Sequence, residues 1–344
     1  MNGGTFTTGK EKERAGIYFN FKTTAQERVS LSERGTVALP VASSWGEAKT
    51  FVSISSVEDL NKKVGLSIDD PSLLLLREAK KNAKTVLMYR LTEGVRASAD
   101  IAEGVKATAV YGGTKGNDII IRINQNVLDA DSFDVTTYMD ESEVDKQTVK
   151  KAEELTANGY VTFTGTGDLS STIPLTGSEG DTAAEALKAS AGIRLSGGTD
   201  KAPVNSDYTD FLAAAETESF DVIALPVAEG DQLKATFAAF IKRLRDGQGQ
   251  KVQGVTANYA GDYEGIINVT EGVLLEDGTE VTPDKATAWV AGASAGATFN
   301  QSLTFVEYEA PLMCYTALTT TRLLNVWAKA NFYSHSTPAI NPSV

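Results

Sequence analysis

Residues 71–91, PSLLLLREAKKNAKTVLMYRL, decide the fold class because they join a capped helix directly to a strand. Asp70 can accept hydrogen bonds from the first helical turn, and Pro71 suits the first helical position. Residues that recur every four positions predict the buried face of this helix: Leu75, Ala79 and Ala83. The run over 85–91 then predicts a buried strand.

Helices and strands alternate on both sides of this stretch. Before it, strands are predicted over 16–21 and 35–41, the second stopped by Pro40, and Ser56 and Gly65 frame a short helix. After it, helices are predicted over 208–216, 233–245 and 282–297, and strands over 221–227, 252–258 and 265–269. Apolar strands between helices indicate an α/β class with a mainly parallel sheet covered by helices.

Residues 92–198 have a different character and predict a separate, inserted β domain. Their apolar and polar residues alternate in short runs, and one helix is predicted near 142–157; the clearest strand runs are 105–111, 118–123 and 160–164. Residues 96–200 contain 17 acidic and 9 basic residues, which is eight of the chain's 13 excess negative charges. We therefore expect this domain to face solvent, where like charges repel each other least.

Composition excludes several kinds of function. The 344 residues are enough for two or three domains, and 45 acidic against 32 basic residues give a net charge of −13, which argues against nucleic acid or an anionic membrane as the main partner. A single cysteine, Cys314, and a single histidine, His335, allow neither an internal disulfide nor a zinc site, and no cofactor is predicted. Met1–Arg14 lacks the apolar run of a secretory signal, so we expect a soluble protein from a reducing compartment.

Three motifs resemble chemical sites, but their context is wrong for chemistry. Gly292–Gly296 (GASAG) fits the nucleophile elbow of serine hydrolases, yet it falls inside a predicted helix, where small residues favour close helix packing. Gly112–Asn117 lacks the Gly-Lys-Ser/Thr of a phosphate loop and predicts a turn between strands. An aspartate cluster lacks the glycine and glutamate of a calcium loop: Asp129, Asp131 and Asp134. No catalytic, cofactor-binding or metal-binding residue is predicted.

Two alternative functions remain open from the residues alone. A serine hydrolase would use Ser294 with His335 as its base and Glu307 or Glu309 to orient that base. A surface-binding module would use the acidic β domain, residues 96–195.

Six segments carry a resemblance to a known family. In chain order they are Gly3–Phe6, 34–46, Leu74–Leu91, Tyr111–Asp118 (YGGTKGND), Phe240–Gly249 (FIKRLRDGQG) and Ala288–Phe305. The ordered set resembles the tail sheath proteins of contractile-tailed phages and prophages, especially those of Gram-positive bacteria. The resemblance extends from Met1 to about Glu309.

The resemblance implies both an architecture and a function. The expected parts are an N-terminal arm (1–16), an α/β part of the inner core (17–91), an outward-facing β-sandwich (92–198) and a subtilisin-like α/β domain without protease chemistry (199–309). A sheath subunit polymerises helically around the tail tube and contracts to drive the tube through the bacterial envelope. The implied partners are further copies of the chain, the tail tube protein, the baseplate and the tail terminator, within a virion assembled in the bacterial cytoplasm. Neither nucleic acid nor membrane insertion is expected.

Candidate assembly residues lie in two places. The N-terminal arm contains a stretch without a local core of its own, for which a frayed terminus is the alternative interpretation: Gly3, Gly4, Thr5 and Phe6. A basic helix face is the second candidate, for an acidic patch on a neighbour or on the tube, and a solvated helix face is the alternative: Lys242, Arg243 and Arg245.

Residues 310–344 depart from the family pattern. They hold the chain's cysteine and histidine and the run Thr319–Thr321. Back-translation of Leu324–Tyr333, read one nucleotide earlier, permits the sequence ERLGKGEFLF, which suits a helix end, a turn and a strand. We hypothesise that this region is encoded out of frame; a divergent but genuine tail is the alternative.

Overall fold

The structure is a computed structural model that describes residues 35–170, 192–275, 278–298, 300–304, 306 and 308, and the backbone of 311–316. The strand predicted over 16–21 and the N-terminal arm lie outside the described residues.

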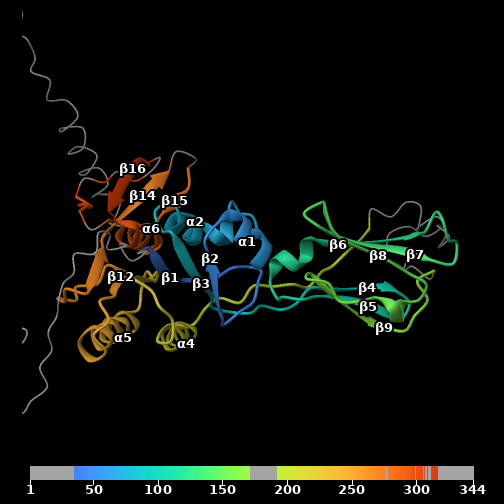
Figure 1. Cartoon of the computed structure of the whole chain (residues 1–344), viewed down its shortest axis with the longest axis horizontal. Helices are drawn as coiled ribbons and strands as arrows, with labels where there is room; N and C mark the ends of the chain where they lie inside the picture. Colours follow the sequence, from blue (N-terminus) through green and yellow to red (C-terminus); the bar gives the residue numbers. More distant parts are fainter. Residues whose placement is uncertain are drawn as a thin grey trace, which may run out of the picture. The chain divides into compact units, whose positions relative to one another are not determined.

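A six-stranded sheet forms the centre of the α/β core (Figure 1), in the order β13-β12-β11-β1-β3-β2. Its strands are β1 (Thr36–Val41), β2 (Phe51–Ile54), β3 (Thr85–Arg90), β11 (Val222–Leu225), β12 (Gln253–Ala257) and β13 (Ile266–Val269). Neighbouring strands are parallel except at the β2 edge, where β2 runs antiparallel to β3. The predicted mainly parallel sheet is therefore confirmed.

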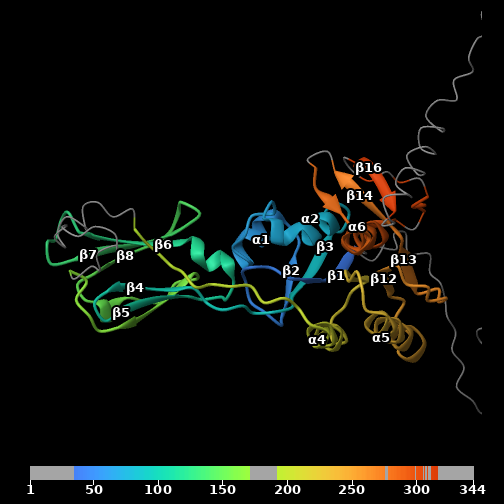
Figure 2. The same cartoon turned by 180° about the vertical axis from the view of Figure 1, so that it is seen from behind.

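Helices cover both faces of this sheet (Figures 1 and 2). They are α1 (Val57–Lys63), the 3₁₀ turn η1 (Pro71–Leu73), α2 (Leu74–Lys80), α4 (Asn205–Ala215), α5 (Asp231–Lys242), the π-helical turn η4 (Arg243–Gly247) and α6 (Pro283–Gly296). Successive side chains of a strand point to opposite faces of the sheet, so neighbouring residues of β1 belong to two different hydrophobic clusters. Val37 and Leu39 belong to the cluster that contains residues of α2 and α6, whereas Ala38 belongs to the cluster of α4 and α5.

The predicted helix signals are confirmed at α1 and α2. The Ser56 side chain accepts a hydrogen bond from the Asp59 amide, and Gly65 follows the helix with a φ of 73°. Asp70 accepts hydrogen bonds from the Ser72 amide (2.9 Å) and hydroxyl (2.6 Å), and Pro71 occupies the first turn.

The prediction that Pro40 stops its strand is wrong. Pro40 lies inside β1, opposite Tyr89 of β3. The carbonyl of Thr36 accepts a hydrogen bond from the Asp221 amide on the β11 side, so by alternation the backbone nitrogen of Pro40 also faces that side. The ladder with β11 pairs only Val37 and Ala38, and the proline therefore sits beyond it.

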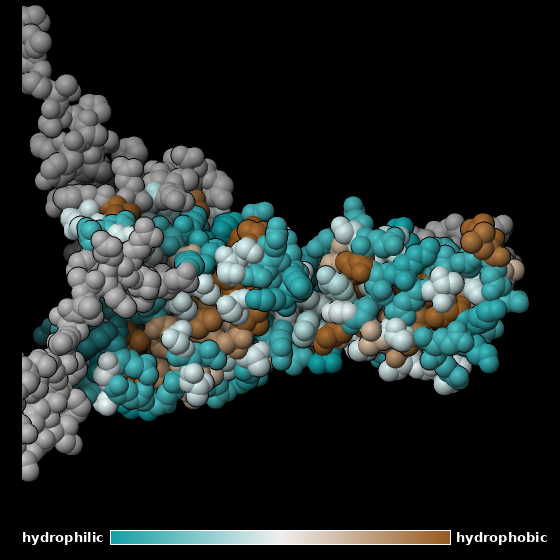
Figure 3. All heavy atoms as spheres, viewed as in Figure 1, coloured by the Kyte–Doolittle hydropathy of each residue, from teal (hydrophilic) through white to brown (hydrophobic). Residues whose placement is uncertain are grey.

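The β domain consists of two antiparallel sheets, in the orders β10-β6-β7-β8 and β4-β5-β9. Its elements are β4 (Ser98–Ala102), β5 (Val105–Ala109), η2 (Thr114–Asp118), β6 (Ile119–Gln125), β7 (Phe133–Met139), β8 (Ser142–Val149), η3 (Ala152–Glu154), β9 (Val161–Gly165) and β10 (Ile193–Arg194). Ile119, Ile121 and Ile123 of β6 point into the core, and the residues between them are partly exposed. Figure 3 shows mainly hydrophilic residues on the visible face of this domain.

The helix predicted near 142–157 is wrong, because residues 142–149 form strand β8 and only the turn η3 is helical. The reason is the tight turn that precedes β8. Asp140 and Glu141 both have positive φ, 48° and 69°, and Met139 pairs with Ser142 across them. A two-residue turn of this kind fixes an antiparallel hairpin, and its usual Asn-Gly signal is absent here.

A third sheet, β15-β14-β16, lies beside α6. It contains β14 (Glu271–Leu275), β15 (Glu280–Val281) and the backbone of β16 (Pro311–Thr316), all paired antiparallel. Among the helices of the described residues, none combines the length and hydrophobicity that a membrane crossing requires.

Helices α2 and α6 approach each other closely through two glycines, as the sequence predicts. A side-chain carbon on Gly292 would overlap the carbonyl oxygen of Ala79, and one on Gly296 would overlap that of Asn82. Neither backbone can retreat easily, since Ala79 and Gly292 are both buried. The GASAG motif is thus explained by helix packing.

Substitution Gly292→Val is expected to lower the free energy of unfolding by about 1–3 kcal/mol, the usual range for overpacking a core. Urea unfolding followed by circular dichroism measures this loss. Gly247→Ala is the matched control, because a side-chain carbon there would meet only Arg243 at 3.9 Å. Equal stability of the two variants would contradict the close approach of α2 and α6.

Candidate assembly surfaces

The predicted assembly residues fall into two groups. Gly3, Gly4, Thr5 and Phe6 lie outside the described residues. Lys242 and Arg243 are exposed at the junction of α5 and η4, and Arg245 is partly buried in η4. The structure therefore describes only the basic helix face.

Both arginines of this face have partners within the chain. The Arg243 guanidinium donates to both carboxylate oxygens of Glu216, at 2.7 and 3.0 Å, and thereby lowers the pKa of Glu216. Arg245 donates to the carbonyl of Val252 at 2.9 Å and to Glu264 at 2.8 Å, and the bond to Glu264 raises the pKa of Arg245. An acidic neighbour would have to compete with these carboxylates.

Lys242 differs from the two arginines. Its ammonium lies 5.9 Å from the centre of the Tyr263 ring, a cation–π contact at an exposed site. Such a contact stabilises the ammonium by about 0.5–1 kcal/mol. Because this is weak and Lys242 is exposed, an acidic group could still bind the ammonium.

Ser294 does not occupy a nucleophile elbow. It lies near the end of α6, well beyond the Thr282–Pro283 start of that helix, and its buried Oγ has no hydrogen-bond partner among the described residues. Its predicted base, His335, lies outside the described residues. Within the described part of the chain, no group of three His, Cys, Asp or Glu side chains is arranged to hold a metal ion.

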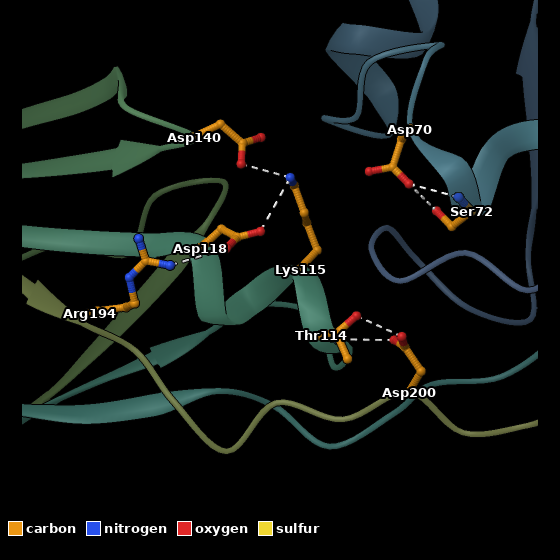
Figure 4. Close-up of polar contacts among 8 residues, drawn as sticks. All are labelled: Asp70, Ser72, Thr114, Lys115, Asp118, Asp140, Arg194 and Asp200. Atoms are coloured by element: carbon orange, nitrogen blue, oxygen red, sulfur yellow. Dashed lines mark hydrogen bonds and ion pairs between the residues drawn. The ribbon is translucent and has the colours of Figure 1, made fainter. Parts of the chain in front are cut away.

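The Gly112–Asn117 loop is filled by a carboxylate of the chain itself (Figure 4). Asp200 accepts hydrogen bonds from the Thr114 amide at 3.0 Å and from the Thr114 hydroxyl at 2.7 Å. The next residue, Lys115, contacts Asp118 at 3.4 Å and Asp140 at 2.7 Å. The loop therefore joins parts of the chain, and an aspartate stands where a phosphate loop would hold its anion.

Arg90, at the end of β3, connects the α/β core to the β domain. Its side chain is 2% exposed. Nε donates to the carbonyl of Ser43 at 2.9 Å, and the two terminal nitrogens donate to the carbonyls of Gly46 and Gly112. Burial lowers the pKa of Arg90, but guanidinium stays charged in proteins. One buried cation thus binds a loop of the core and the segment between β5 and η2 of the β domain.

Aromatic and backbone contacts surround this arginine. Trp45 is 1% exposed and packs edge-on against Tyr111 at 5.3 Å and nearly parallel to Tyr160 at 6.2 Å. A side-chain carbon on Gly113 would overlap the carbonyl of Ser44, so backbone meets backbone here. We call the set of Arg90, Trp45, Tyr111, Tyr160 and the Thr114–Asp200 pair the junction.

The junction was not predicted as a unit from the sequence. Trp45-Gly46 and Tyr111–Asp118 stood out only as separate segments of a resemblance. For Arg90 the sequence predicts only a place in a buried strand, because nothing in the local sequence indicates that an arginine will be buried. Each of the two segments places an aromatic residue next to glycine, which is compatible with a close contact between backbones.

An exposed apolar pair was also not predicted. Val127 and Leu128 are each 97% exposed, in the loop between β6 and β7. The Asn126 side chain accepts hydrogen bonds from the amides of Leu128 (2.8 Å) and Asp129 (3.1 Å), which fixes the loop. The pair is a candidate contact surface of the β domain.

Asp134 of β7 anchors this loop to the sheet. Its carboxylate accepts a hydrogen bond from the Asn126 side chain at 2.8 Å. This bond, followed by those from Thr148 and Lys146, lowers the pKa of Asp134 to about 2. The carboxylate therefore stays ionised over the whole neutral range and keeps its hydrogen bonds there.

The chain belongs to the phage tail sheath family. Three family models match it consecutively: the N-terminal region of domain III of tail sheath protein Gp18 over residues 34–91, the phage tail sheath protein beta-sandwich domain over 91–200, and the phage tail sheath protein central domain over 201–324. The β-sandwich model covers the domain built from the two antiparallel sheets.

Individual relatives agree with this family. The chain is 99% identical over 309 residues to the phage-like element PBSX protein XkdK of Bacillus subtilis strain 168, a match that covers 90% of the chain and 66% of that relative. The sheath tail protein of Desulfitobacterium hafniense has a TM-score of 0.74 at 44% identity, covering 91% of the chain and 70% of that structure. The sheath tail protein of Listeria innocua has a TM-score of 0.71 at 48% identity, covering 86% and 64%. The chain thus spans about two thirds of these relatives' lengths.

Substitution Arg90→Met is expected to lower the free energy of unfolding by at least about 3 kcal/mol, because it leaves three buried carbonyl oxygens without a donor. Arg96→Gln is the control: Arg96 is exposed and pairs with Glu93 at 3.0 Å, so its loss changes stability by no more than about 1 kcal/mol. Urea unfolding of both variants measures the difference. Similar small losses in both would show that the junction does not depend on Arg90.

Proposed function

We propose that the chain is a structural subunit of a contractile tail sheath, which polymerises helically around the tail tube and contracts to drive the tube through the bacterial envelope. The observation that carries this proposal is the consecutive match of three sheath models to residues 34–324. The sheath-type β-sandwich set into an α/β core supports it.

The physical basis of the proposal is a contact in which one surface of a copy binds a different surface of the next copy. Contacts that do not close into a ring generate a filament from identical copies. Two packings of the same copies, separated by a barrier, can store the free energy that contraction releases. The proposed partners are further copies of the chain, the tail tube protein, the baseplate and the tail terminator, in a virion assembled in the bacterial cytoplasm.

The position of the β domain, the topology of residues 199–309 and the contact residues are proposed from the family resemblance. We place the β-sandwich on the outside of the sheath, and we propose a subtilisin-like topology for residues 199–309. The parallel strands and covering helices of the core are compatible with that topology. Gly3–Phe6 remain the proposed arm contact. Of the basic face, Lys242 is the better-supported contact, since Arg243 and Arg245 already bind carboxylates.

The hydrolase alternative is not favoured. Ser294 lies within a helix that packs against α2, and the sheath family is structural. Its small neighbours are needed for helix approach, which explains the motif without chemistry.

We further propose that Ala310–Val344 is encoded out of frame and replaces the family's C-terminal part. The 99% identity to the Bacillus subtilis relative extends over 309 residues, which equals the number of residues that precede Ala310. A segment that lacks the family's sequence would also lack its inter-subunit strand.

The out-of-frame proposal predicts that this chain is a monomer or a small oligomer. Size-exclusion chromatography with light scattering and negative-stain microscopy measure its state. Resequencing the gene across Glu309, together with an intact mass, tests the reading frame independently. Long tubes, or an uninterrupted coding frame through Cys314 and His335, would contradict the proposal.

The sheath proposal predicts that antibodies against the chain label tail particles along their whole length, in cells that make the longer relative to which the chain is 99% identical over 309 residues. Antibodies against residues 92–198 should bind intact tails, because the β domain is proposed to face outward. Antibodies against residues 222–225, a buried strand, are the control and should bind only denatured tails. Labelling confined to one end of the tail, or no labelling, would contradict a sheath role.

A further inference from the structure

Strand β2 forms one edge of the six-stranded sheet, and helix α1 follows it in the chain. An edge strand presents backbone N–H and C=O groups that can pair with a strand of another molecule. We propose that α1 closes this edge through Asp59 and Lys63, and that β2 without these two side chains pairs with β2 of a second copy of the chain. The closure itself does not depend on the proposed function.

The neighbouring strand shows which backbone groups of β2 face outward. The amides of Thr85 and Leu91 donate to backbone carbonyls on the β1 side of β3, so by alternation the backbone groups of Leu87 also face β1. Ser53 lies opposite Leu87, and its own N–H and C=O therefore face the open side of β2. The same alternation directs the backbone groups of Ser55 to that side.

Two side chains of α1 bind these outward groups. The Lys63 ammonium donates to the Ser53 carbonyl at 2.7 Å. The Asp59 carboxylate accepts a hydrogen bond from the Ser55 amide at 3.3 Å and another from the Ser55 hydroxyl. The hydroxyl bond, followed by the amide bond, lowers the pKa of Asp59, so the carboxylate is ionised at neutral pH and keeps both bonds. An added strand would need the two backbone groups that these side chains occupy.

The local sequence positions Asp59 and Lys63 on one face of α1. Strand β2 ends at Ile54 and α1 begins at Val57, so the helix starts directly beside the edge. The Ser56 hydroxyl accepts a hydrogen bond from the Asp59 amide at 3.1 Å, which fixes this start. Residues four apart lie on the same helix face, and the two side chains also pair with each other at 3.7 Å. Figure 1 shows α1 beside β2.

Strand β2 is otherwise suited to pairing. Its sequence, FVSI, contains three residues that favour strands, and it contains neither a charge nor a proline, which are the usual protections of an edge. Two copies can pair antiparallel about a twofold axis, where each strand supplies the same groups to the other. A second copy is therefore the partner that an opened edge would take. In a polymer of many copies, the closed edge would prevent this pairing from competing with assembly, and only this purpose rests on the proposed sheath function.

The double variant Asp59→Ala/Lys63→Met tests the inference, because it removes both closing side chains and leaves the net charge unchanged. In dilute solution we expect the Ser55 amide to exchange its hydrogen roughly tenfold faster, the effect of losing a hydrogen bond to a charged group. In concentrated solution we expect the mass measured by light scattering to become twice that of the unaltered chain. The amides of Ser53 and Ser55 should then exchange more slowly as concentration rises, because pairing occupies them. Nuclear magnetic resonance measures exchange at these single amides.

Glu58→Ala/Lys62→Met is the matched control, because it removes an exposed acid and an exposed lysine, also four residues apart, from the same helix. It should behave like the unaltered chain. Equal masses of the two double variants at every concentration would overturn the inference. So would protection that appears in strands other than β2, or concentration-dependent protection of Ser53 in the unaltered chain. The assay uses the isolated chain, so its failure would leave the sheath proposal standing.

Discussion

The buried guanidinium of Arg90 is the interaction on which the relation between the two halves of the chain depends. A buried cation that has lost its water must find hydrogen-bond acceptors locally, and the carbonyls of Ser43, Gly46 and Gly112 supply them. These carbonyls belong to a core loop and to the β domain, so the charge is satisfied only when both are in place. Packing of Trp45 against Tyr111 and Tyr160 excludes water from the same region.

The α/β core brings Arg90 to that position by ordinary means. Parallel strands place the end of β3 beside the end of β1, where the loop to β2 begins. Alternate residues of β1 then serve two separate clusters, one under α2 and α6 and one under α4 and α5. The glycines of α6 bring that helix against α2, and this pair also receives the chain that leaves the core through Tyr308.

Much of this fold follows from local sequence signals. Asp70-Pro71 and Ser56 start helices where expected, and the alternation in β6 predicts a half-buried strand. Local signals failed where the turn between two neighbouring strands lacked its usual residues, and where contacts between distant residues decided the outcome. Residues 142–149 form a strand because a turn with two positive φ angles, at Asp140 and Glu141, pairs them with β7. The junction could not be predicted, since Arg90 and Gly112 meet only after both domains fold.

The central claim is that Arg90 joins the core and the β domain into one body. Cryo-electron microscopy of tails assembled from the longer relative, to which the chain is 99% identical over 309 residues, tests it most directly when tails are compared before and after contraction. The account predicts that residues 36–41, 85–90 and 98–165 superpose in both states, with the Gly112 carbonyl still bound to Arg90. A β domain rotated against the core, with that bond broken in one state, would contradict the account.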